Sequence, residues 1–135
     1  MTNLTGKRIF IVEDDVVNMA VFATVLKQSG ATVVQDPWNS QTIHLILRQM
    51  PVDIILLDLM LRHGVSGYEI YDQLRLTPEL AEIPVVAVSA SDPVAGIQKA
   101  REKGFAGFIS KPIRLNEFAD QIADILNGEE LWLAV

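Results

Sequence analysis

Short apolar runs rich in β-branched residues recur along the chain, and each one is followed by a polar or small turn. Runs of this kind are typical of buried strands. They predict five strands, over residues 8–12, 31–35, 53–58, 84–90 and 107–110. Between them, apolar residues recur with the 3.6-residue period of a helix. These segments predict five helices, over residues 16–29, 39–50, 67–76, 93–103 and 115–127, the last with Leu115, Phe118, Ile122, Ile125 and Leu126 on one stripe.

The strict alternation of strands and helices predicts an α/β fold, a parallel sheet with helices on both faces. The almost continuously apolar runs at 53–58 and 84–90 agree, because central parallel strands are buried on both sides. We interpret residues 1–127 as one domain and residues 128–135 as a tail outside this pattern. In the tail, Trp132 and Leu133 are interpreted as a cap on the last helix or as a contact with a partner.

Composition narrows the range of functions. The 135 residues fit one domain. The absence of cysteine excludes disulfides, thiolate zinc sites and a cysteine nucleophile. A formal charge of −6 opposes nucleic-acid binding, which depends on cationic side chains that displace counterions from phosphates. We therefore expect a protein partner and no nucleic acid.

Nothing in the sequence predicts a membrane segment. The apolar runs are broken by charges well before the roughly 18 residues that would be needed to cross a bilayer. The first residues, MTNLTGKRIFIVEDD, have an apolar stretch too short for a secretory signal. The expectation is a soluble cytoplasmic protein.

Polar residues stand where the predicted strands end. Ligands of parallel α/β sheets bind outside the carboxyl ends of the strands, so these residues should meet at one edge. They are Glu13, Asp14 and Asp15 after the first strand, Asp58 after the third, Ser89 after the fourth and Lys111 after the fifth. Buried charges of this kind are costly without partners.

A hard divalent cation between Glu13, Asp14 and Asp58 would resolve that cost, because Mg²⁺ takes oxygen ligands and commonly shares them with phosphate. A carboxylate can act as a nucleophile on phosphorus. The metal and the Lys111 ammonium would offset charge on the transferring oxygens, and Ser89 could donate to one of them. The pattern favours phosphoryl transfer to Asp58.

Each of these residues has an ordinary structural interpretation when it is taken singly. An acidic run most often caps a helix, and we expect Asp15 to do so while Glu13 and Asp14 face the metal. Asp58 alone could cap a turn, and Lys111 alone could be a solvated charge. Among other residues, His44 and His63 are interpreted as solvated, and Phe105 and Phe108 as core. The combination in this order favours function.

The segments IFIVEDD, IILLDLM, PVVAVSA and FISKP resemble, in order and spacing, the receiver domain of two-component response regulators. The resemblance implies a flavodoxin-like fold with strand order 2-1-3-4-5. It also implies a stand-alone regulator that takes phosphate from a histidine kinase or phosphotransferase, without being a turnover enzyme. The resemblance leaves undecided whether the protein forms a homodimer on phosphorylation.

Carried over by motif, the resemblance assigns a role to each matching position. Asp58 is the phosphoacceptor, and Mg²⁺ or Mn²⁺ is held by Glu13, Asp14, Asp58 and the main-chain carbonyl of Met60. Lys111 contacts phosphate and precedes Pro112 through a cis peptide. Ser89 is the hydroxyl of a switch in which Phe108 turns inward after phosphorylation.

Some positions depart from the commonest pattern. The segment LMLRHGVSG after Asp58 is one residue longer than usual and has Arg62 where a proline often stands. Phe108 replaces the more frequent tyrosine. Met60 and Ser91 stand where receiver domains usually hold the attacking water, and neither suits that task. We therefore expect slow self-dephosphorylation, unless Arg62 or His63 orients the water instead.

Other functions fit less well. A flavin carrier would need a phosphate cradle after the first strand, where this chain has three acids. The glycine patterns of P-loop and dinucleotide-binding proteins are absent. A phosphatase of the haloacid type would need D-x-D after its first strand, where this chain has EDD. The remaining alternative is a receiver-like interaction module that works without phosphorylation.

Overall fold

Six parallel strands form one sheet in the described part of the chain, in the order β2-β1-β3-β4-β5-β6. The computed structural model describes residues 3–38, 41–90 and 92–133, with the backbone alone at His63. The strands are β1 (Arg8–Val12), β2 (Thr32–Asp36), β3 (Ile54–Leu57), β4 (Val85–Ser89), β5 (Gly107–Ser110) and β6 (Leu131–Leu133). The first five confirm the predicted flavodoxin-like order.

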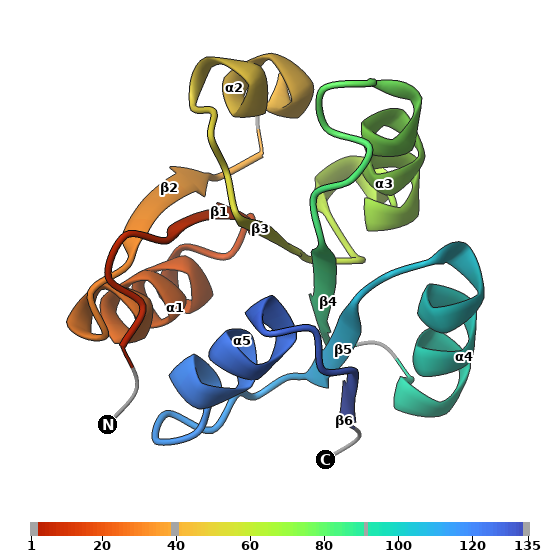
Figure 1. Ribbon diagram of the computed structural model, residues 1–135. Helices are drawn as coiled ribbons and strands as arrows, with labels where there is room; N and C mark the ends of the chain where they lie inside the picture. Colours follow the sequence, from red (N-terminus) through yellow and green to blue (C-terminus); the bar gives the residue numbers. More distant parts are fainter. Residues whose placement is uncertain (1–2, 39–40, 91, 134–135) are drawn as a thin grey trace.

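Helices cover both faces of this sheet, as Figure 1 shows, with α1 and α5 on one face and α2, α3 and α4 on the other. They are α1 (Val16–Gln28), α2 (Thr42–Arg48), α3 (Gly67–Leu76), α4 (Pro93–Lys103) and α5 (Phe118–Leu126). A short 3₁₀ turn, η1 (Arg62–Gly64), lies between β3 and α3. This is the predicted three-layer α/β architecture.

Alternate residues of the strands build two separate cores. Phe10, Leu57 and Phe108 point to the side of α2, α3 and α4. Ile11 and Leu56 point to the side of α1 and α5. Because β3 and β4 are buried along their whole length, the middle of the sheet is fixed on both faces. Side chains at the strand ends are therefore held by a rigid support.

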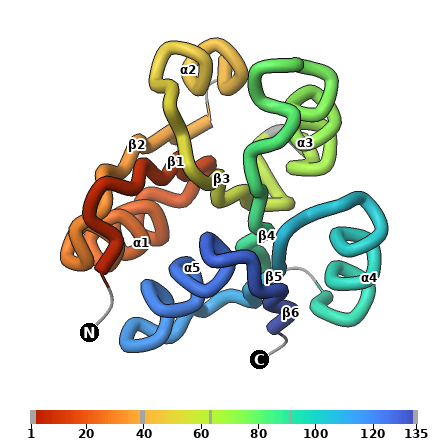
Figure 2. Tube along the Cα trace, in the orientation of Figure 1, coloured from red at the N-terminus to blue at the C-terminus, as the bar shows by residue number. Residues whose placement is uncertain are grey.

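The tail differs from the sequence interpretation, because Leu131–Leu133 forms β6 and extends the sheet beyond β5. The chain leaves α5 through Gly128, whose φ of 93° suits glycine. Trp132 then lies opposite Phe108 in the strand register and packs against the same core. Figure 2 shows this last segment running beside β5. The three apolar residues therefore complete the sheet edge.

Two helices, α5 and α2, are clearly shorter than predicted. The predicted helix 115–127 begins only at Phe118, and Leu115 is 62% exposed. Residues before Phe118 form a hydrogen-bonded turn, in which Glu117 N–H donates to the Arg114 carbonyl over 3.0 Å. The predicted helix 39–50 narrows to Thr42–Arg48, and its first two predicted positions lie outside the described residues.

None of the helices in the described ranges is both long enough and apolar enough to cross a membrane.

Candidate functional site

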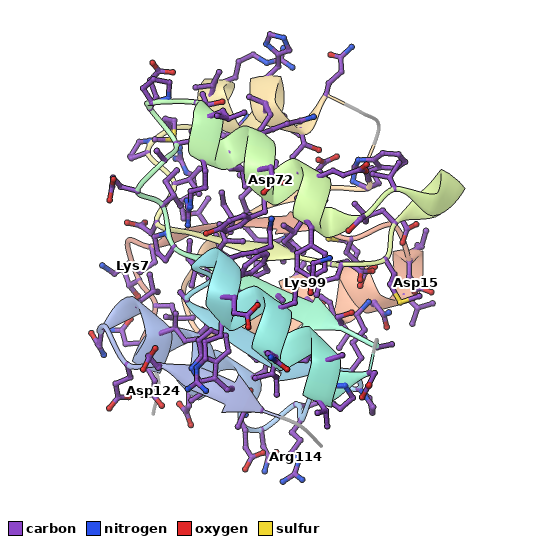
Figure 3. The ribbon with its side chains drawn as sticks, turned by 90° about the vertical axis from the view of Figure 1, so that its right-hand side faces the viewer. Lys7, Asp15, Asp72, Lys99, Arg114 and Asp124 are labelled. Carbon is purple, nitrogen blue, oxygen red and sulfur yellow. The ribbon has the colours of Figure 1, made fainter. Side chains whose placement is uncertain are left out.

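The strand register brings the predicted polar residues together at the carboxyl edge of the sheet. Val12 of β1 pairs with Leu57 of β3, so Glu13 and Asp58 leave neighbouring strands at the same level. At the other side of the site, Lys111 N–H donates to the Ser89 carbonyl over 2.9 Å. In Figure 3, Asp15 marks this end of the molecule, opposite Lys7, which precedes β1.

The Lys111 ammonium contacts two buried carboxylates of the site. Its Nζ lies 2.5 Å from Glu13 Oε1 and 3.1 Å from Asp58 Oδ2. The exposed side-chain fractions are 13% for Lys111, 1% for Glu13 and 6% for Asp58. A cation this close to two buried carboxylates relieves part of the cost of burying them. The three side chains therefore form one charge cluster.

Burial is also what sets the proton affinities in this cluster. Burial raises the pKa of Glu13 to about 7, with the Lys111 ammonium acting against this and Asp58 adding to it. Burial alone would lower the pKa of Lys111, but the two carboxylates outweigh it and raise that pKa overall. Lys111 therefore stays charged at neutral pH, whereas the Glu13 carboxyl gains or loses its proton near pH 7.

Glu13, Asp14 and Asp58 could together hold a metal ion. Each offers one carboxylate oxygen, and the three oxygens lie within 4.8 Å of one another. The set fits Mg²⁺, which prefers hard oxygen ligands and keeps some of its waters. The site is open to solvent at Asp14, which has 17% of its side chain exposed. An ion could enter there.

Asp58 is oriented through both of its oxygens. The Met60 N–H donates to Asp58 Oδ1 over 3.0 Å, while Oδ2 faces Lys111. The Met60 side chain is 62% exposed. The predicted role of the Met60 carbonyl as a metal ligand stays a prediction. Ser91, the other predicted water-holding position, lies outside the described residues.

Several structural predictions for neighbouring residues are confirmed. Asp15 caps α1, since its Oδ1 accepts from the Asn18 N–H over 2.9 Å. Phe105 and Phe108 are core residues, and His44 is exposed. The Lys111–Pro112 peptide bond is cis, and so is Met50–Pro51, which the sequence did not single out.

The expected switch residues lie deep in the structure. Ser89 is fully buried at the end of β4. Phe108 is fully buried too, on the face of β5 that Trp132 helps to cover. The Phe108 ring is therefore already buried in this structure, and its expected movement on phosphorylation stays a prediction.

Two residues beside the site were missed or left open by the sequence. Arg62 Nε lies 3.7 Å from Asp14 Oδ2, so the extra loop turns back onto the acidic edge. Gly67 begins α3 so close to Asp58 that a Cβ there would collide with the Asp58 carbonyl oxygen and lie 2.9 Å from the Leu59 Cα. The sequence showed a glycine at the start of a predicted helix. It did not show the close approach to Asp58 that requires glycine there.

The comparisons agree with this geometry. Residues 9–123 match the model of the response regulator receiver domain. The polar-differentiation response regulator DivK of Brucella ovis is 33% identical over 120 residues, which cover 89% of this chain and 96% of DivK.

Solved structures give the same fold. A sensor protein from Polaromonas sp. JS666 has a TM-score of 0.81 at 20% identity, covering 91% of this chain and 98% of that one. The non-phosphorylated HemR receiver domain of Leptospira biflexa has a TM-score of 0.77 at 26% identity, covering 89% and 94%. At 20% identity the first similarity is evidence for the fold alone.

Proposed function

Because this chain belongs to the family of response-regulator receiver domains, we propose that it takes a phosphoryl group from a phosphohistidine of a protein partner onto Asp58. The partner is a histidine kinase or a histidine phosphotransferase. One observation supports this most: a single lysine, Lys111, stands within 3.1 Å of both Glu13 and Asp58 at the open carboxyl edge of the sheet. A structural ion pair would not need a third acid beside it.

The transfer uses an Asp58 carboxylate oxygen as the nucleophile. This oxygen attacks phosphorus, an acyl phosphate forms, and the bond from phosphorus to the histidine nitrogen breaks with its electron pair left on the imidazole. Asp58 loses its negative charge when the new bond to phosphorus forms, and the imidazole nitrogen takes up that charge with the electron pair. Lys111, which contacted the carboxylate, can then pair with the negatively charged phosphoryl oxygens. The Met60 N–H keeps the carboxyl group oriented for the attack.

Glu13, Asp14 and Asp58 would hold Mg²⁺ or Mn²⁺. When bound, such an ion offsets negative charge on the oxygens of the transferring group. The chain assists its own phosphorylation in this way and is not a turnover enzyme. The protein would work in the cytoplasm together with its phosphohistidine donor.

The output is a change of surface for a downstream protein. Ser89 would move toward the phosphoryl group and transmit the change through β4 to the surface of α4, β5 and α5, as a population shift between two states. Phe108, whose ring is buried in this structure, would take part in this change as the aromatic residue of the switch. Amide shifts on adding beryllofluoride should concentrate at residues 89–112.

Phosphotransfer from labelled donors tests the proposal. Candidate kinases and phosphotransferases carrying labelled phosphohistidine are mixed with wild type, with Asp58→Asn and with Asp15→Asn as the control. Asparagine caps a helix as well as aspartate does, so the control keeps α1 intact. Wild type and Asp15→Asn should take the label and Asp58→Asn should not. Transfer to Asp58→Asn at the wild-type rate would refute the assignment.

A further inference from the structure

We infer that Arg62 is a built-in competitor of the divalent cation: its guanidinium holds Asp14, and it has to release Asp14 before the ion can bind. This inference rests on the proposed function, because it concerns the same metal-binding carboxylates. It adds a residue that tunes how readily the site is loaded.

Arg62 contacts Asp14 through two of its guanidinium nitrogens. Its Nε lies 3.7 Å from Asp14 Oδ2, and its Nη2 donates to the Asp14 main-chain carbonyl over 3.2 Å. Asp14 has the largest exposed side-chain fraction of the three carboxylates, 17% against 1% for Glu13 and 6% for Asp58. The guanidinium therefore stands at the open side of the cluster, where an ion would enter.

The loop places Arg62 there through its backbone. Leu61, the preceding residue, is 7% exposed and belongs to the core. Its N–H donates to the Val65 carbonyl over 3.0 Å, and the Val65 N–H donates to the Arg62 carbonyl over 3.3 Å. Met60 and Ser66 bridge the base of the loop. The Cα of Arg62 is thus anchored next to the site, while 54% of its side chain stays exposed.

The charges at the site divide into two pairings. Lys111 contacts Glu13 and Asp58, and Arg62 contacts Asp14. A divalent cation that took an Asp14 oxygen would meet the positive guanidinium at close range, and like charges oppose each other there. The half-exposed arginine can swing into solvent, so the competition is an equilibrium that lowers the apparent affinity for the ion and does not abolish it.

A Mg²⁺ titration of unphosphorylated protein, followed by amide shifts at fixed pH and salt, measures this competition. Arg62→Ala should bind Mg²⁺ about twofold to fivefold more tightly than wild type, the range expected from losing one partly exposed ion pair. Arg62→Lys keeps the charge and should lie between the two. Arg48→Ala, which removes one exposed positive charge from the end of α2, should bind like wild type.

The Arg62 Nε–H signal gives a second readout. In wild type it should shift with the same midpoint as the Mg²⁺ titration, because the ion displaces the guanidinium. Equal affinities for wild type and Arg62→Ala, or an unmoved Nε–H signal, would reduce the contact to an ordinary surface ion pair. Weaker binding by Arg62→Ala would make Arg62 a positioning residue for Asp14 and would also overturn the inference.

The same samples separate this inference from the proposed function. Acetyl phosphate at saturating Mg²⁺ should phosphorylate wild type, Arg62→Ala and Arg48→Ala at Asp58. If all three are phosphorylated but their Mg²⁺ affinities are equal, only the competition is wrong. If wild type gains no phosphoryl group on Asp58, the proposed function itself fails.

Discussion

Glu13 is the acid whose chemistry the fold changes most, because burial raises its pKa to about 7. A carboxyl must lose its proton to bind a metal ion, so Mg²⁺ affinity should rise with pH through about 7 and level off above it. Between about pH 6 and about pH 8 we expect an increase of roughly tenfold. Calorimetric titrations at several pH values measure this.

Glu13→Gln serves as the control for that pH dependence, because glutamine keeps the shape of the side chain and does not titrate. It should bind Mg²⁺ more weakly and with a nearly flat pH profile. A profile as steep as that of wild type would assign the proton to another group.

Met60 bears on how long the acyl phosphate survives. Its exposed apolar side chain stands two residues after Asp58 and offers no good partner for an attacking water. Met60→Asn should therefore lose its phosphoryl group severalfold faster than wild type, measured as decay of purified phosphoprotein in Mg²⁺ buffer. Met60→Leu, which stays apolar, should decay like wild type. Equal decay of all three variants would mean that another group, such as Arg62, holds the water.

The start of α3 lies close against Asp58. Alanine in place of a helical glycine ordinarily stabilises by up to about 1 kcal/mol. At Gly67 the added Cβ would collide with the Asp58 carbonyl, so Gly67→Ala should instead destabilise by about 1–3 kcal/mol. Urea unfolding measures the change. A stabilised variant would show that α3 can shift away from Asp58 without cost.

The turn before α5 and the last strand allow a comparison of two apolar residues. Trp132 packs against the core beside Phe108, and the Arg101 guanidinium lies 4.9 Å from its ring centre. Trp132→Ala should cost about 2 kcal/mol, less than a fully buried tryptophan. Leu115→Ala should cost under about 0.5 kcal/mol, because Leu115 is 62% exposed. Urea unfolding measures both changes. Equal losses of unfolding free energy in the two variants would contradict the packing of Trp132 in β6 against the core.

These two residues also show where periodicity stops being informative. The apolar spacing placed Leu115 on the helix stripe, but Glu117 makes no side-chain capping bond, and the helix begins one residue after it. Spacing alone does not mark such an end. Leu131–Leu133 is too short to display a strand period, and its pairing with β5 depends on residues more than twenty positions earlier.

Across the molecule, the sequence predicted the cluster of polar residues around Asp58 because topology does most of the positioning. Once the strands are parallel, Glu13, Asp58, Ser89 and Lys111 must meet at one edge. The contact of Arg62 with Asp14 depends instead on the path of one irregular loop, which no period encodes. Phe108 was expected in the core, but the contribution of Trp132 to covering it could not be seen before β6 was placed.

Asp58 alone is proposed to accept the phosphoryl group. Intact-mass measurement after incubation with acetyl phosphate and Mg²⁺ tests it most directly, with Asp15→Asn as the matched control. Wild type and Asp15→Asn should each gain one phosphoryl mass, and Asp58→Asn should gain none. A phosphoryl mass on Asp58→Asn at the wild-type rate, or none on wild type, would contradict the account.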